Sequence, residues 1–186
     1  MAIGLVALGV VLVLLFLVSL YNRLVGLRNR AENAFRTIDV QLKQRCDLIP
    51  NIVNAVRGYM TYEQSTLERL TALRQQATSP GVTAPERLAL DTQMSGLLHG
   101  LVARVEAYPD LKSSEQVVML QRSLNEVEAQ LAAARRTYNS AVTAYNTAIE
   151  TIPANMVAGA FGFTTRPLFE AAAEERAVPS VGALRS

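Results

Sequence analysis

The feature that most constrains this chain is the apolar run at its start. From Ala2 to Leu20 the only polar side chain is Ser19. About 20 apolar residues in a helix that rises 1.5 Å per residue cross a hydrocarbon core of roughly 30 Å. A removed signal peptide would have a basic segment before the run and a small-residue cleavage site after it, and neither is present. The sequence therefore predicts a transmembrane anchor over residues 1–20.

Basic residues follow the anchor closely. Arg23, Arg28, Arg30 and Arg36 come after it, whereas only the terminal amine precedes it. Because positive charge near a span favours the cytoplasmic side, the remainder of the chain is predicted to lie in the cytoplasm. The single cysteine, Cys46, cannot form an intramolecular disulfide, which is compatible with that compartment.

The length of 186 residues leaves room for one further domain. Only 18% of residues are charged and 50% are hydrophobic, which is too apolar for a disordered chain. The net charge of +2 comes without a basic stripe, so nucleic-acid binding is excluded as a hypothesis.

The clearest helical pattern runs from about Leu111 to Ile152. Ser113 with Gln116 is a candidate capping box at its start, and Pro153 marks its end. The apolar positions alternate at spacings of three and four, which a strand cannot produce. They are Val117, Leu120, Leu124, Val127, Leu131, Ala134, Tyr138, Ala141, Tyr145, Ala148 and Ile152.

Three further helices are predicted ahead of it. The first continues the anchor as one helix through an apolar stripe from Leu20 to Leu42. The second begins at Asp47, as the capping residue, with Pro50 in its first turn, and ends at 78–81. Asp47 marks either a full reversal of the chain or only a kink. The third runs from about Pro85 to Val105.

These elements predict an all-α fold in which an N-terminal transmembrane helix is continuous with an antiparallel four-helix bundle. The bundle is expected over residues 21–163, and a partly flexible C-terminal tail over 164–186. The apolar segment 156–163, with Phe161 and Phe163, either packs under the bundle or touches the membrane interface.

Residues for catalysis are scarce. The one histidine, His99, lies in a helical run, where a structural role is commoner than catalysis. A di-iron bundle needs Glu-x-x-His pairs, but position 96 is glycine. Glycine loops that hold phosphate are also absent from the sequence. We therefore predict a protein that is not an enzyme and has no catalytic residue, cofactor, metal or small-molecule substrate.

Several polar residues are instead candidates for structural or interaction roles. Asp39 borders the apolar stripe and is either buried against Arg45, Arg57 or Arg136, or half-exposed. Tyr138 and Tyr145 lie seven residues apart on the buried stripe, with hydroxyls that need a polar partner. Asn139 and Asn146 follow them and are candidates for interhelical bonds or for a partner surface.

A set of short motifs resembles the LemA family. They are Tyr21-Asn22-Arg23-Leu24-Val25, Ile38-Asp39-Val40-Gln41-Leu42-Lys43, Asp47-Leu48-Ile49-Pro50-Asn51, Gly58-Tyr59, Ala134 to Asn139, Tyr145-Asn146-Thr147, Pro153 and Phe161-Gly162-Phe163. The resemblance covers roughly Leu20 to Glu170. It implies a bacterial inner-membrane protein with a short outer N-terminus and a cytoplasmic helical bundle. A magnetosome-associated branch of the family suggests roles in membrane organisation.

Together these observations predict a membrane-anchored scaffold or adaptor. Its expected partners are the lipid bilayer, further copies of itself and a membrane protein, because tethering to a membrane raises the effective concentration of its copies. The alternative is a sensor or accessory subunit that regulates a membrane enzyme such as a protease.

Overall fold

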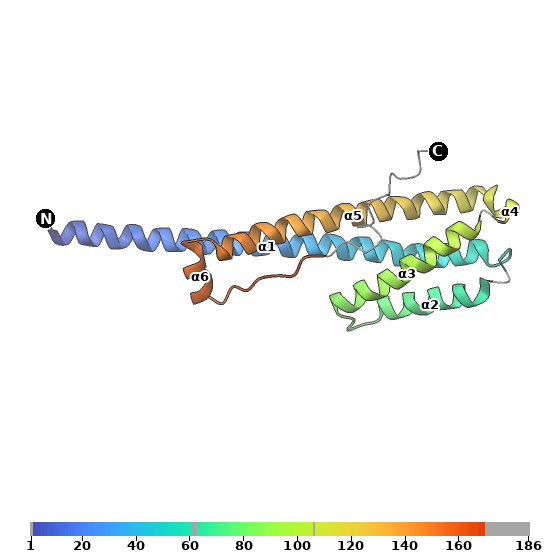
Figure 1. Cartoon of the computed structure of the whole chain (residues 1–186), viewed down its shortest axis with the longest axis horizontal. Helices are drawn as coiled ribbons and strands as arrows, with labels where there is room; N and C mark the ends of the chain where they lie inside the picture. Colours follow the sequence, from blue (N-terminus) through green and yellow to red (C-terminus); the bar gives the residue numbers. More distant parts are fainter. Residues whose placement is uncertain (1, 61–62, 106, 170–186) are drawn as a thin grey trace, which may run out of the picture. The chain divides into compact units, whose positions relative to one another are not determined.

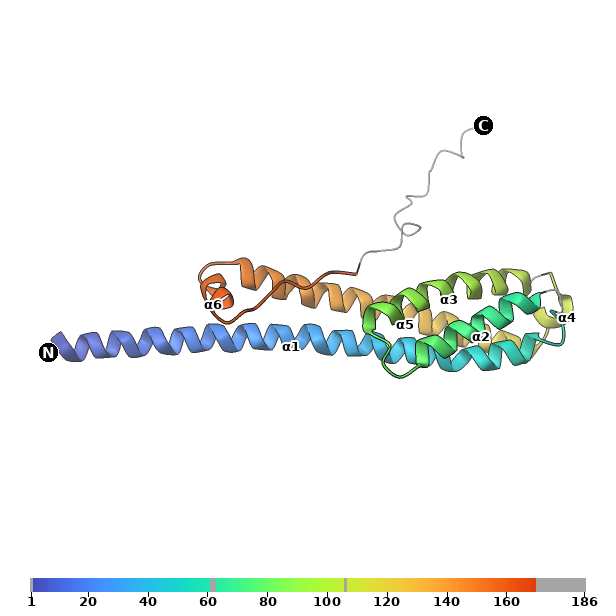
Figure 2. The ribbon, with the colours of Figure 1, turned by 90° about the horizontal axis from the view of Figure 1, so that it is seen from below.

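The computed structural model describes residues 2–60, 63–105 and 107–169, which form helices joined by turns and extended segments, with no strand among them. Figure 1 and Figure 2 label the helices α1 to α6 in chain order. Their bounds are α1 Ala2–Val56, α2 Gln64–Thr78, α3 Ala84–Val105, α4 Pro109–Lys112, α5 Glu115–Glu150 and α6 Ala154–Ala160. The predicted all-α class is confirmed. The flexible end expected from Ala171 onward lies outside the described residues.

Helix α1 is 55 residues long and contains the whole apolar run. It is the one helix in the described chain that is long and apolar enough to cross a membrane. The apolar side chains of that run are exposed from Ile3 to Val18. The expectation that the anchor and the helix after it form one element is confirmed.

The prediction that a new helix begins at Asp47 is wrong. Pro50 lies inside α1, and Asp47 is an exposed helical residue that caps nothing. A proline has no N–H, so the carbonyl of Cys46, four residues earlier, loses its helical donor. The Nε atom of Arg74 in α2 donates to that carbonyl at 2.9 Å. The helix therefore continues, since its orphaned acceptor is satisfied by another helix.

The chain leaves α1 at Val56, later than predicted. Gly58, a poor helix former, follows closely, and the amides of Tyr59 and Met60 both donate to the Val56 carbonyl at 3.0 Å. The Met60 side chain is buried, which fixes the path of the connection to α2. The next turn agrees with the sequence: α2 ends at Thr78, and Gly81 has a φ of +87°, a conformation suited to glycine.

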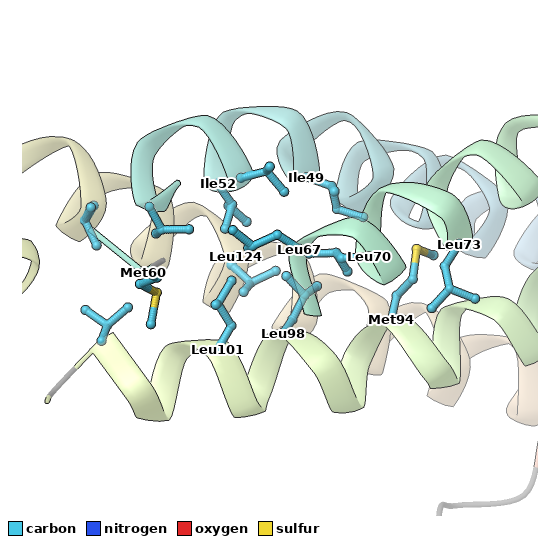
Figure 3. Close-up of a cluster of buried hydrophobic side chains, with 14 of the residues drawn as sticks. Ile49, Ile52, Met60, Leu67, Leu70, Leu73, Met94, Leu98, Leu101 and Leu124 are labelled. Atoms are coloured by element: carbon cyan, nitrogen blue, oxygen red, sulfur yellow. The ribbon is translucent and has the colours of Figure 1, made fainter. Parts of the chain in front are cut away.

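Two compact units make up the chain, and each contains parts of α1 and α5. The first unit is Met1–Ala34 with Arg135–Ser186, and the second is Phe35–Ala134. In the second unit, α2 and α3 lie side by side and share a core with α1, α4 and α5 (Figure 3). The side chains labelled in Figure 3 include Ile49, Leu70, Leu98 and Leu124, one from each of the four longer helices.

Helix starts follow local chemistry. At α3 the Glu86 carboxylate accepts from the Thr83 amide at 2.8 Å and from its hydroxyl, which is a capping box that the sequence reasoning did not identify. The box proposed at Ser113 and Gln116 is wrong, because Ser113 ends α4 and its hydroxyl donates to the Asp110 carbonyl. The long helix accordingly begins at Glu115 rather than near Leu111.

Loss of the bond between Arg74 and the Cys46 carbonyl is expected to destabilise the fold only because Pro50 has no N–H to donate to that carbonyl. Arg74→Met should lower the free energy of unfolding by about 1–3 kcal/mol, since it leaves a polar acceptor unpaired. In a Pro50→Ala background residue 50 regains its N–H, so the same change should cost less than about 1 kcal/mol. Denaturant unfolding in detergent, followed by circular dichroism, measures both.

Arg69→Met is the matched control, because Arg69 is an exposed arginine of the same helix. Its effect should stay within about 0.5 kcal/mol. Equal losses from Arg74→Met with and without the Pro50→Ala substitution would show that the carbonyl is not what Arg74 supports.

Candidate functional site: the C-terminal strap and the buried ion cluster

An extended segment after α6, residues 164–169, lies along α5 in the first unit (Figures 1 and 2). We call it the strap. It falls within the predicted flexible tail, and it is held by side chains that the sequence reasoning selected: Tyr138, Asn139, Tyr145 and Asn146.

The two asparagines hold the strap by its backbone. The amide of Asn146 donates to the Arg166 carbonyl and accepts from the Arg166 N–H, both at 2.9 Å. The amide of Asn139 makes the same pair of bonds with Phe169, at 2.9 and 2.8 Å. Each asparagine therefore replaces one residue of a neighbouring strand, because its donor and acceptor satisfy one N–H and one C=O. Asparagine and glutamine suit this role because one side-chain amide carries both a donor and an acceptor.

The two tyrosines add a second row of bonds. The hydroxyl of Tyr145 donates to the Thr164 carbonyl at 3.0 Å, and the hydroxyl of Tyr138 donates to the Pro167 carbonyl at 3.2 Å. Both rings are buried, as predicted, and the Tyr138 ring meets Phe169 edge to face at 4.9 Å. Burial raises the pKa of the Tyr138 hydroxyl, against a smaller lowering by Arg166, so it remains a donor at neutral pH.

The spacing of the repeat matches the geometry of the strap. Seven residues of helix advance about 10.5 Å, and three residues of extended chain advance about 10 Å. The tyrosines and the asparagines are each seven apart, and their partners are each three apart: Thr164 with Pro167, and Arg166 with Phe169. The Tyr-Asn repeat is therefore a fixed register between a helix and an extended segment that runs in the opposite direction.

The strap also contacts α1. The guanidinium of Arg166 pairs with the Glu32 carboxylate at 2.7 Å. Just before the strap, Phe163 lies under the guanidinium of Arg28 at 5.5 Å and meets the Tyr21 ring at 5.8 Å. These contacts tie the C-terminal segment to the part of α1 that directly follows the apolar run.

The Phe161-Gly162-Phe163 motif is a helix stop. Gly162 has a φ of +70°, and the Phe163 amide donates to the Ala158 carbonyl at 3.0 Å, which together make a Schellman turn at the end of α6. On α6 itself, Ala154, Val157 and Ala158 pack against Leu20, Leu24, Tyr145 and Ile149. Ile152 was predicted to be the last buried residue of the long helix, and this prediction is wrong. The residue is exposed because α5 already ends at Glu150.

The second unit contains a buried ion cluster that the sequence reasoning missed. Arg45 of α1 is 3% exposed and pairs with Asp91 of α3, 1% exposed, at 2.9 Å. The same nitrogen, Nη1, also donates to the Ser95 hydroxyl, and Nη2 pairs with Glu128 of α5 at 2.5 Å. One guanidinium thus joins three helices. Asp39 does not pair with Arg45: it is 46% exposed and pairs with Arg87.

Cys46 and His99 are the two remaining candidates for reactive side chains. Burial raises the pKa of the Cys46 thiol, and Asp91 adds to the effect, so the thiol is protonated at neutral pH. His99 is exposed, and its Nε2 lies 3.2 Å from Glu128 at the outer edge of the ion cluster. Among the described residues no group of three or more His, Cys, Asp or Glu is placed to hold a metal.

The fold and the strap define an all-helical protein with an N-terminal helix apolar enough for a membrane and a C-terminal segment fastened beside it. Comparison with known proteins gives the family. Residues 34–182 match the model of the LemA family, and the chain belongs to that family, as its motifs indicated.

Curated relatives agree. The chain is 27% identical over 165 residues to Protein LemA of Metamycoplasma hominis, covering 89% of this chain and 75% of that protein. It is 25% identical over 195 residues to Magnetosome protein MamQ 2 of Paramagnetospirillum magneticum, covering 90% and 72%. Magnetosome protein MamQ of Magnetospirillum gryphiswaldense is 24% identical over 168 residues, covering 77% and 62%.

The buried ion pair is expected to be far more sensitive to mutation than the exposed one. Asp91→Ala leaves Arg45 buried without its most deeply buried partner and should cost about 3–5 kcal/mol of unfolding free energy. Asp39→Ala, which removes the carboxylate of the exposed pair, should cost less than about 1 kcal/mol. Denaturant unfolding of both variants measures the difference, and equal costs would contradict the assignment.

Loss of the asparagines is expected to release the strap. Each asparagine makes two bonds worth about 0.5–1.5 kcal/mol apiece, so Asn139→Ala with Asn146→Ala should raise local opening by at least tenfold. Hydrogen exchange at the Arg166 and Phe169 amides measures this opening. Asn51→Ala, at an exposed asparagine of α1, is the control and should change neither amide. Unchanged protection in the double variant would mean that other contacts hold the strap.

Proposed function

We propose that this LemA-family chain is a membrane-anchored, non-catalytic scaffold or adaptor. Its apolar helix stays in the bacterial inner membrane as a single span, and its helical part lies in the cytoplasm as an antiparallel four-helix bundle. The protein self-associates and organises the membrane or membrane-protein complexes through that bundle.

One observation carries this proposal: a single helix, α1, contains both a bare apolar surface and part of a packed core. The side chains from Ile3 to Val18 are exposed and apolar, while Ile49, Ile52 and Val56 of the same helix are buried. An apolar surface of that length is unstable in water and fits a hydrocarbon core. Relatives named as magnetosome proteins fit a role at a membrane.

Two further observations support a binding role over a catalytic one. In the strap the polar side chains bond to the backbone of the same chain, and in the Arg45 cluster they pair with one another. These groups are therefore engaged within the protein. The reactive Cys46 is buried and protonated. The cytoplasmic placement is supported by the four arginines between positions 23 and 36.

The test of the anchor uses two charges in the apolar run. Val11→Arg with Leu14→Arg should prevent stable insertion, because each arginine at the centre of a span costs about 2.5–3.5 kcal/mol on the insertion scale. After alkaline extraction the unchanged chain should remain in the membrane pellet and the double variant should not. The matched control, Val11→Leu with Leu14→Val, should behave as the unchanged chain.

The test of self-association counts copies of the tagged chain in native-lipid nanodiscs by stepwise photobleaching, with mass spectrometry on the same particles. Two or more copies per particle support the scaffold. One copy with a stoichiometric enzyme favours the alternative of a regulatory subunit. One copy alone, at every expression level, contradicts both.

A further inference from the structure

Beside the end of the apolar run, α6 and the residues at its two ends carry large apolar side chains that are mostly exposed. The buried side of α6 contacts Leu20 and Leu24 through Ala154, Val157 and Ala158. Three large apolar side chains of α6 and its two ends, Ile152, Met156 and Phe161, are 78%, 73% and 65% exposed. We call these three side chains the α6 apolar face.

The segment that carries this face lacks charge. From Thr151 to Thr165 the sequence has no ionisable side chain, although Glu150 and Arg166 flank the segment. Three large, exposed apolar side chains in a 15-residue uncharged stretch are costly in water and are typical of a surface that meets another apolar phase.

The position of α6 along α1 identifies that phase. The Phe161 ring meets Tyr21 at 4.8 Å, and Tyr21 directly follows the last residue of the apolar run. Both views of the ribbon show α6 beside this stretch of α1 (Figures 1 and 2). From Leu20 to Leu24 a helix advances about 6 Å. The interfacial layer on each side of a bilayer is about 5–7 Å thick, so α6 lies at the depth of that layer.

The length of the run leaves little freedom in this placement. The 19 residues from Ala2 to Leu20 extend about 28 Å as a helix, which nearly equals the hydrocarbon thickness of roughly 30 Å. A shift of the chain along the membrane normal would take apolar residues out of the hydrocarbon or draw Arg23 into it.

We propose that the α6 apolar face inserts into the lipid interface beside the anchor, so that the first unit contacts the bilayer through two segments rather than one. The partner is the lipid surface itself. Aromatic rings are favoured at this level, and Tyr21, Phe161 and Phe163 form a contiguous aromatic group there. Insertion of α6 fixes the rotation of α1 about its axis, which a lone span leaves free. The proposal rests on the membrane anchoring proposed above.

The sequence contains no tryptophan, so one introduced tryptophan reports its own depth. Four single variants of the full chain in vesicles with lipids brominated near the headgroup end of the acyl chains form the test. Met156→Trp and Phe161→Trp lie on the proposed face. Val10→Trp lies within the anchor, and Asn29→Trp is at an exposed position of α1 about 14 Å beyond Leu20.

We expect Met156→Trp and Phe161→Trp to emit at shorter wavelength than Asn29→Trp and to be quenched at least twofold by the brominated lipid, while Asn29→Trp is not quenched. Helical circular dichroism confirms that each variant is folded. If Val10→Trp is quenched by deeply brominated lipid but both α6 variants behave as Asn29→Trp, the interface proposal is wrong and the anchor stands. If Val10→Trp is also unquenched, the anchoring itself is wrong.

Discussion

The second unit depends on α1 passing Pro50 without a break. A proline inside a helix deprives one carbonyl of its donor, and in this chain that carbonyl belongs to Cys46. Arg74 supplies a replacement from α2. The same bond therefore satisfies α1 and fixes α2 against it. Because the helix continues, Ile49, Ile52, Val53 and Val56 remain on one stripe with Leu42 and Cys46, and the core of the unit forms around them.

A different constraint organises the first unit. The strap has no regular secondary structure, yet its backbone groups are satisfied as they would be in a sheet, by the side chains of a helix. This works because the rise of seven helical residues is nearly the same as the rise of three extended ones. The strap, α6 and the aromatic group around Tyr21 thereby bring the C-terminal part of the chain to the end of the apolar run.

Much of this could be read from the sequence. The apolar run, the helical stripes and the turn at Gly81 follow from local rules, and the Tyr-Asn repeat singled out the four side chains that hold the strap. Their partner could not be inferred, because nothing in the repeat says whether a helix, a strap or another protein faces it. The prediction of a helix start at Asp47 was wrong for a physical reason. An aspartate three residues before a proline is typical of a helix start, and only the distant Arg74 makes continuation of the helix favourable.

The Arg45 cluster, by contrast, left a signal that could have been used. Arg45 is three residues after Leu42, and Asp91 is three before Met94, so both charges lie on apolar stripes that are buried on either side of them. A charge at such a position requires a buried partner of opposite sign.

The most direct measurement of the central claim, an unbroken α1, is the distance between spin labels at Arg36→Cys and Asn54→Cys in a Cys46→Ala background. Eighteen residues of continuous helix predict about 27 Å with a narrow distribution. A chain that reverses at Asp47 would place the two labels on neighbouring helices, whose axes are roughly 8–10 Å apart, and such a short distance would contradict the account.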